Sequence, residues 1–179
     1  MKKNGLKLKK AFTLIETLVA ITILSAAVAG PMALSIKNIG IATVSKDQLV
    51  AFYLGQEVIE YVRNVRDTNI LSESSDWLEG VKDDCKETAD SVGCYIDVIK
   101  IPVIVVSCLK SCPKLDFDEV NYTYKPGGAD GNSVFTRTVK IENPVGTNSD
   151  EAKVNVSVKW TGKYGEKIVN LQDNIFNWR

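Results

Sequence analysis

The chain has no histidine among its 179 residues. Histidine is the commonest general base at neutral pH and the commonest metal ligand, so its absence removes the usual starting point for acid–base or metal chemistry. The serine and aspartate residues show neither the spacing of a hydrolase nucleophile elbow nor that of a Walker loop. We therefore expect no enzyme activity, no catalytic residue, no metal site and no cofactor.

The chain also lacks internal repeats, low-complexity tracts and any stripe of lysine and arginine in its later part. Five of its 22 basic residues lie within the first ten positions, and the other 17 are set against 22 acidic residues, a net charge of −5. A mildly acidic surface argues against nucleic acid as the primary ligand.

A single long apolar run extends from Ala11 to about Ile36, directly after the lysine cluster. At 1.5 Å per residue, a helix over residues 12–36 is roughly 35–40 Å long, which is enough to cross a bilayer core of about 30 Å. The lysines should stay in the cytoplasm, and the rest of the chain should be exported.

Glu16 is the one charged residue in this run. An isolated acid at membrane depth costs on the order of 2–4 kcal/mol, so such a residue usually has a partner. Cleavage before Phe12 would create an α-amino group four residues away, on the same helical face. Between two staggered chains, the amine of one could meet the carboxylate of the next and neutralise both charges.

The sequence Lys9-Lys10-Ala11-Phe12-Thr13-Leu14-Ile15-Glu16 strongly resembles the leader of type IV pilins and type II secretion pseudopilins. The resemblance implies that a prepilin peptidase cuts between Ala11 and Phe12, that Phe12 is N-methylated, and that Glu16 guides assembly. The family normally has glycine before the cut, so Ala11 predicts slower processing rather than none.

The same resemblance implies partners and a location. The partners would be prepilin peptidase, other pilin subunits, a membrane platform protein and an assembly ATPase. The chain would cross the cytoplasmic membrane once, with its N-terminus in the cytoplasm and its head exported, and would then enter a surface or periplasmic filament. Pili, type II secretion and DNA-uptake systems share this leader, so the motif does not distinguish them. The large cysteine-bearing head and Ala11 favour a minor subunit, and the stretch from Gln56 to Asp67 followed by Trp77 resembles minor pilins of the pilus-modification kind.

Two alternatives stay open for the N-terminus and the head. A secretory signal peptide could be cut after Ala27-Val28-Ala29, before Gly30, although Glu16 serves no purpose in such a peptide. The mature chain would then be a secreted or membrane-tethered binding domain that does not polymerise. Acidic loops such as Asp116–Glu119 or Ala129–Asn132 could hold calcium, but we interpret them as solvated surface.

The apolar helix should continue into an amphipathic helix over residues 37–67. Gly30 and Pro31 predict a kink or a local break, because proline removes a backbone hydrogen bond and clashes one turn back. Ser45, with Gln48 three residues later, could cap a restart. An apolar stripe then recurs at helical spacing, formed by Ala51, Leu54, Val58, Val62 and Val65.

Residues 68–179 should form a β-rich head, giving an α+β, pilin-like fold of a long helix packed on an antiparallel sheet. Residues 152–160 alternate apolar and polar side chains without fault, as a half-buried strand does. Residues 135–141 alternate except at Arg137, and Gly162–Gly165 reverses the chain. Further strands are expected at residues 95–99, 101–106 (interrupted by Pro102), 120–124 and 168–171, followed by a C-terminal turn that docks Ile175, Phe176 and Trp178.

The four cysteines, Cys85, Cys94, Cys108 and Cys112, all follow the membrane segment, where disulfides persist. We expect nearest neighbours to pair, although two other connectivities are possible. A four-cysteine zinc site is the rival, but neither pair has Cys-x-x-Cys spacing.

Overall fold

The computed structural model describes residues 13–127, 131–143, 149–162 and 165–178. The chain divides into two units, Met1–Thr43 and Val44–Arg179. The cleavage site predicted at Ala11 and Phe12 lies outside the described residues. One helix, α1, covers Leu14–Leu71 and contributes to both units.

Helix α1 is continuous across Gly30 and Pro31, so the local break predicted there is not seen. It also passes Ser45 without a restart, and it ends at Leu71, one turn later than expected. A proline removes only one hydrogen bond from a long ladder, and the bonds on either side hold the helix together. A bend at Pro31 stays a prediction.

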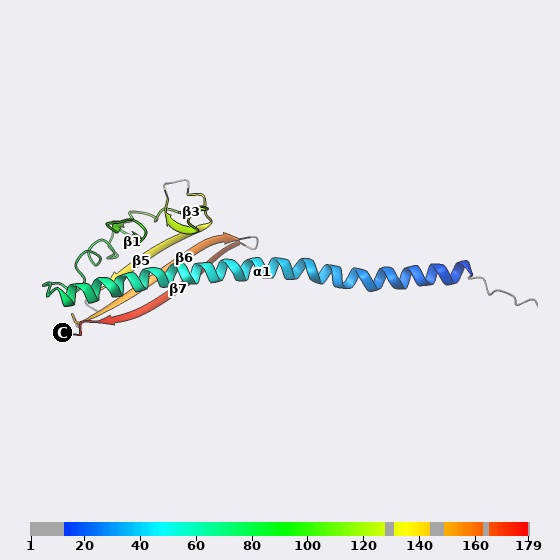
Figure 1. Cartoon of the computed structure of the whole chain (residues 1–179), viewed down its shortest axis with the longest axis horizontal. Helices are drawn as coiled ribbons and strands as arrows, with labels where there is room; N and C mark the ends of the chain where they lie inside the picture. Colours follow the sequence, from blue (N-terminus) through cyan, green and yellow to red (C-terminus); the bar gives the residue numbers. More distant parts are fainter. Residues whose placement is uncertain (1–12, 128–130, 144–148, 163–164, 179) are drawn as a thin grey trace, which may run out of the picture. The chain divides into compact units, whose positions relative to one another are not determined.

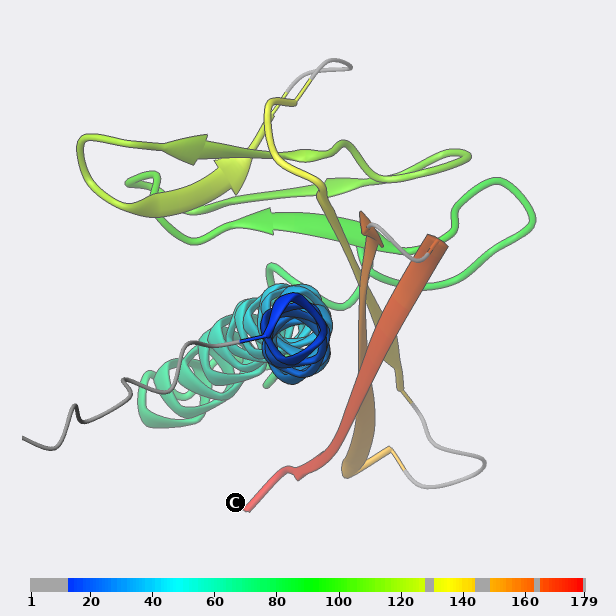
Figure 2. The same cartoon turned by 90° about the vertical axis from the view of Figure 1, so that its right-hand side faces the viewer.

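The described residues of the second unit form two antiparallel sheets (Figures 1 and 2). The larger has the strand order β2-β1-β5-β6-β7, and the smaller pairs β3 with β4. The strands are β1 (Cys94–Asp97), β2 (Ile104–Ser107), β3 (Leu115–Asp118), β4 (Thr123–Pro126), β5 (Phe135–Glu142), β6 (Glu151–Gly162) and β7 (Gly165–Phe176).

The core of this unit lies between its part of α1 and the larger sheet. The predicted helical stripe is buried at Ala51, Leu54, Val58 and Val62 and half-buried at Val65. Opposite it, the alternate β6 side chains from Ala152 to Trp160 are buried, as their period of two predicted.

The C-terminal segment differs from expectation. Strand β7 pairs with β6 over its whole length, from Gly162↔Gly165 to Glu151↔Phe176. The expected turn at Ile175 and Phe176 is therefore wrong, because these residues lie in the strand, with Ile175 buried and Phe176 exposed. The polar stretch Gln172 to Asn174 obscured this continuation, because Gln172 and Asn174 lie on the exposed face of the sheet.

Strand β3 was not predicted, and β4 begins at Thr123 rather than Val120. The sequence of β3 is Leu-Asp-Phe-Asp, and its two acids obscure a strand whose apolar residues are Leu115 and Phe117. Aromatic contacts connect the β3–β4 pair to the larger sheet. The centre of the Phe117 ring lies 4.8 Å from that of Tyr124. Tyr124 in turn meets Phe135 of β5 at 5.7 Å.

Candidate functional site

The N-terminal unit begins with a capped helix. The backbone N–H of Glu16 donates to the carbonyl of Thr13 at 3.1 Å and is within 3.3 Å of its hydroxyl oxygen. Thr13 is therefore the N-cap of α1, and Glu16 lies in the first turn, where an acidic group suits the positive end of the helix dipole. The Glu16 carboxylate forms no salt bridge within the described part of the chain.

The other polar side chains of this segment are satisfied by the helix itself. Their hydroxyls donate to carbonyls three or four residues earlier, at 2.8–3.1 Å, in the pairs Thr17–Leu14, Thr22–Val19, Ser25–Ile21, Ser35–Pro31 and Thr43–Ile39. Such internal bonding removes the cost of placing a hydroxyl in hydrocarbon. Glu16 is thus the one polar side chain between Leu14 and Ser35 whose partner must come from outside the helix.

The apolar side chains of the same segment have no cover. None of the 18 residues in its most apolar window is buried, and the window has a mean hydropathy of 2.0. Exposure is spread around the whole helix, at Leu14, Ile15, Leu18, Val19, Ile21, Ile23, Leu24, Val28, Met32 and Leu34. By length and composition this helix can cross a membrane. A helix that is apolar on every side requires lipid or other helices around it.

Arg137, the exception in the β5 pattern, is buried in the second unit. It is 1% exposed and donates to the carbonyls of Leu54 and Ile96, each at 2.9 Å, and to the Glu57 carboxylate at 2.5 Å. Burial lowers the pKa of Arg137, and the negative charge of Glu57 opposes that shift. One guanidinium therefore connects α1, β1 and β5. In the sequence, this position was visible only as an interruption of the apolar–polar alternation in residues 135–141.

A second link joins the helix to the far strand of the sheet. The Arg63 guanidinium lies 3.0 Å from the Asp173 carboxylate of β7 and 3.2 Å from Glu60. The hydrogen bond to Asp173 raises the pKa of Arg63. Because this cluster is half-exposed, it contributes less to stability than the buried Arg137 contacts.

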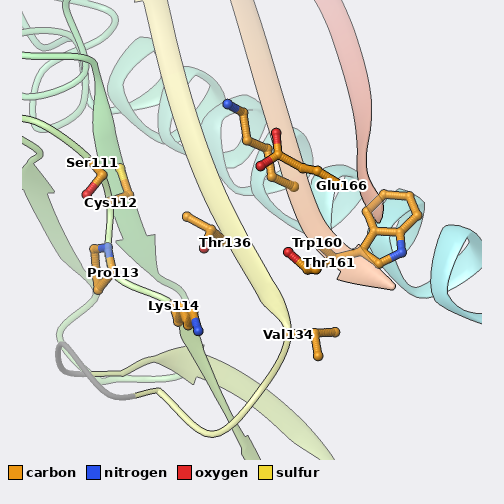
Figure 3. Close-up of a pocket in the computed structure, with 10 residues that line it drawn as sticks. Ser111, Cys112, Pro113, Lys114, Val134, Thr136, Trp160, Thr161 and Glu166 are labelled. Atoms are coloured by element: carbon orange, nitrogen blue, oxygen red, sulfur yellow. The ribbon is translucent and has the colours of Figure 1, made fainter. Parts of the chain in front are cut away.

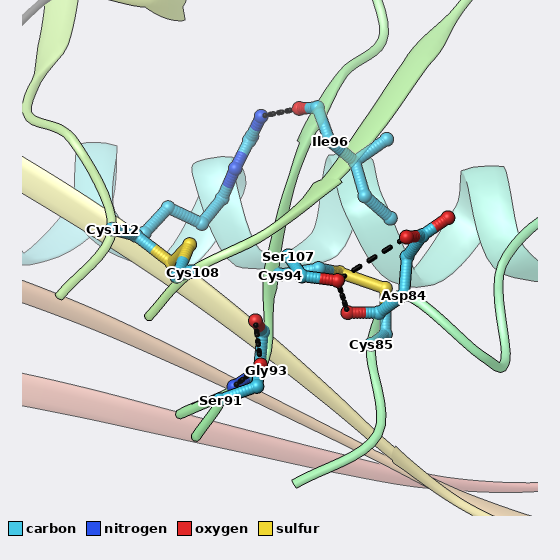
Figure 4. Close-up of a disulfide and its surroundings, with 10 residues drawn as sticks. Asp84, Cys85, Ser91, Gly93, Cys94, Ile96, Ser107, Cys108 and Cys112 are labelled. Carbon is cyan, nitrogen blue, oxygen red and sulfur yellow. Dashed lines mark hydrogen bonds between the residues drawn. A yellow bond between two sulfur atoms is a disulfide. The ribbon is translucent and has the colours of Figure 1, made fainter. Parts of the chain in front are cut away.

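The structure pairs the cysteines as nearest neighbours, Cys85 with Cys94 and Cys108 with Cys112 (Figure 4). All four thiols are therefore used, which overturns the zinc alternative. The first bridge is fully buried and connects the polar segment after α1 to the start of β1. Beside it, the Ser107 hydroxyl donates to the Asp84 carbonyl at 2.9 Å.

A groove of about 670 Å³ lies against β5, β6, the start of β7 and residues 111–114 at the end of the second disulfide loop (Figure 3). It is lined by Ser111, Cys112, Pro113, Lys114, Val134, Thr136, Lys159, Trp160, Thr161 and Glu166. These side chains combine positive charges, a negative charge and hydroxyl groups. Across the described residues there is no group of three or more cysteine, aspartate or glutamate side chains able to hold a metal.

The N-terminal part of the chain matches a known protein family. The family described as "Prokaryotic N-terminal methylation motif" matches residues 6–30, which include the predicted cleavage site and Glu16. No curated protein and no solved structure matches the chain significantly. The match covers the leader and most of the membrane-capable segment, and it does not extend to the head.

Proposed function

We propose that this chain, which carries a prepilin-type N-terminal methylation motif, is a structural subunit of a type IV pilus-like filament. Prepilin peptidase removes residues 1–11 and methylates Phe12. A membrane platform protein and an assembly ATPase then add the subunit to other pilins. The head is exported, and the N-terminal helix passes from the membrane into the filament core.

The observation that carries this proposal is Glu16 on an otherwise uncovered apolar helix. Every hydroxyl side chain between Thr17 and Ser35 has a partner within the helix, whereas Glu16 has none among the described side chains. Burying an unpaired carboxylate is costly, and a positive group on a neighbouring subunit offsets that cost. The α-amino group of a processed Phe12 has the right charge and lies within the same apolar segment.

The test is incorporation of Glu16 variants into filaments. Glu16→Ala and Glu16→Leu keep the segment apolar, so membrane insertion should hold while the share of the protein in sheared filaments falls. Glu60→Gln, which also removes a carboxylate from α1 but on the exposed face of the head, is the matched control. Unchanged incorporation of both Glu16 variants would show that the charge pair is not needed.

The mature N-terminus provides a separate measurement. Mass spectrometry of the natural protein should give methylated Phe12 as the first residue. A first residue of Gly30 would indicate a signal peptide, and the protein would then be a secreted binding domain. Ala11→Gly should raise the processed fraction, because it restores the residue that the family normally has before the cut.

We further propose that the chain is a minor subunit. The described part of the head has two disulfides and seven strands, which makes it large for a subunit whose N-terminal motif is shared by many pilins. Quantitative mass spectrometry of purified filaments should find it at a small fraction of the copy number of the main subunit. A copy number near that of the main subunit would contradict this assignment.

A further inference from the structure

A second hollow, of about 400 Å³, lies in the head between α1 and the start of β4. Three tyrosines line it, Tyr53, Tyr122 and Tyr124, and we call it the tyrosine hollow. Val50, Leu54, Glu57 and Thr123 complete its lining. Nothing in the filament function described above uses this hollow.

The aromatic rings of the hollow present much uncovered surface. Tyr53 is 63% exposed and Tyr122 is 79% exposed, whereas Tyr124 is half-buried against Phe117 and Phe135. The face of an aromatic ring carries partial negative charge and attracts cations within about 6 Å of its centre. Two exposed rings beside one fixed ring therefore form a surface suited to a positive group.

The β3–β4 turn holds Tyr122 in an uncommon conformation. Its φ is 54°, in the left-handed region that a bulky side chain rarely adopts. The Asp118 carboxylate accepts the backbone N–H groups of Val120 at 2.9 Å and Asn121 at 3.2 Å, and the Phe117 ring lies 6.4 Å from that of Tyr122. These hydrogen bonds and the ring contact hold Tyr122 in place, although its side chain is exposed.

One acidic residue of α1 lines the hollow, and another precedes the lining residues on the same helix. Glu57 lies in its lining, but its carboxylate is already paired with Arg137. Asp47, three residues before Val50 and ten before Glu57 on α1, has no salt bridge among the described side chains. Asp47 is itself half-buried, and its negative charge, after the larger effect of burial, raises the pKa of Tyr124.

We propose that the tyrosine hollow binds an organic cation, and that this cation is the ammonium or guanidinium group of a lysine or arginine side chain on a partner protein. The combination of aromatic rings with an uncompensated carboxylate selects a positive group. The neighbouring side chains favour a protein as the partner, because Leu49, Phe52 and Val120 are large, apolar and more than 40% exposed, and each is within four residues of a lining tyrosine in the sequence. A small free organic cation would leave these three apolar side chains exposed to water, whereas a protein segment would bury them.

The experiment uses the full chain in maltoside micelles, because a phosphocholine detergent would itself supply an organic cation. The tyrosines carry 3-fluorotyrosine, and ¹⁹F NMR follows a titration with the peptide acetyl-Gly-Lys-Gly-amide. The neutral comparison is the same peptide with norleucine in place of lysine. We expect signals of the hollow tyrosines to shift, the Tyr95 signal to stay, and the lysine peptide to bind about three- to tenfold more tightly.

Variants test whether binding depends on the aromatic ring of Tyr122 and on the carboxylate of Asp47. Tyr122→Leu should weaken binding of the lysine peptide about fivefold, whereas Tyr122→Phe, which keeps the ring, should bind as the unaltered chain does. Asp47→Asn should also weaken binding, and Tyr95→Leu should not. An unshifted Tyr95 signal in the Tyr122 and Asp47 variants shows that the head is still folded, and unshifted signals of the hollow tyrosines show it for Tyr95→Leu.

Three results would overturn the inference. Equal binding of the lysine and norleucine peptides would make the hollow an apolar patch without charge selectivity. No shift of the hollow tyrosines with either peptide would remove the site. Tetramethylammonium binding as tightly as the lysine peptide would make the ligand a small free organic cation and not a side chain. None of these results bears on processing at Phe12 or on the role of Glu16, so the filament function is tested separately.

Discussion

The Arg137 guanidinium lies 2.5 Å from the Glu57 carboxylate, 80 positions away in the sequence. The arginine is 1% exposed, whereas the side chain of Glu57 is 38% exposed. The two residues are therefore unequal partners. The arginine is fully desolvated and depends on its three acceptors, while the glutamate keeps part of its hydration.

This asymmetry predicts unequal mutational effects. Arg137→Ala should lower the free energy of unfolding by about 3–5 kcal/mol, because it leaves buried carbonyls unpaired and opens a cavity. Glu57→Gln should cost about 1–3 kcal/mol, reduced by its exposure. Urea unfolding of the full chain in detergent, followed by near-UV circular dichroism, measures both. The control Glu60→Gln, at a side chain that is 75% exposed, should stay within about 0.5 kcal/mol, and an equal effect at Glu57 and Glu60 would contradict the buried pair.

Two glycines with positive φ predict different costs for alanine. At Gly93, with φ of 119°, an added Cβ would lie 2.3 Å from the Val139 carbonyl oxygen. At Gly80, with φ of 89°, it would meet nothing within 4 Å. Gly80→Ala should therefore cost about 1 kcal/mol from backbone strain, and Gly93→Ala about 3–5 kcal/mol from strain plus a backbone clash. The same unfolding measurement compares them, and equal losses would indicate that β1 and β5 are farther apart there.

The two disulfides should differ in their contribution to stability. The chain-entropy relation gives about 2.7 kcal/mol for the Cys85–Cys94 loop and about 2.1 kcal/mol for the smaller Cys108–Cys112 loop. The first bridge is also fully buried in the core, so replacing both of its cysteines by alanine leaves a cavity as well. The loss of stability at Cys85–Cys94 should therefore exceed the loss at Cys108–Cys112 by more than the entropy difference. Thermal unfolding of the two double variants tests the order. Intact mass should rise by about 4 Da on full reduction, since each bridge takes up two hydrogens.

The β3–β4 turn should weaken in acid. Hydrogen bonds from the Asn121 side chain, and then from the backbone N–H groups of Asn121 and Val120, lower the pKa of Asp118 from its ordinary 3.8. Because the folded pKa is the lower one, the turn is stabilised above pH about 4 and loses this contribution as the pH falls through the folded value. An NMR titration of the Asp118 carboxyl carbon measures that value.

A substitution tests whether the Asn121 side chain causes the lowered pKa of Asp118. Asn121→Ala removes the largest contributor, so the pKa of Asp118 should move up toward 3.8. Asn174→Ala on β7, which removes an amide elsewhere in the head, should leave it in place. An unchanged Asp118 pKa in Asn121→Ala would show that the side-chain bond is not formed in solution.

Local patterns of the sequence were sufficient to predict the N-terminal motif and the buried faces of β6 and α1. The match over residues 6–30 agrees with the leader resemblance that rests on Lys9 to Glu16. The period of two in β6 and the helical spacing of Ala51, Leu54 and Val58 predicted the buried faces. These features depend on side chains within a few residues of one another, so short-range periodicity is enough to find them.

The sequence by itself determined a lysine leader, an apolar helix with one acid, and a half-buried sheet beyond it, because membrane transfer and strand alternation are set residue by residue. Only the tertiary structure decided what Arg137 bonds to, how far β7 continues beside β6, and which tyrosines meet at the hollow. Those outcomes depend on contacts between segments far apart in the chain. Their free energies come from burial and pairing that no local pattern contains.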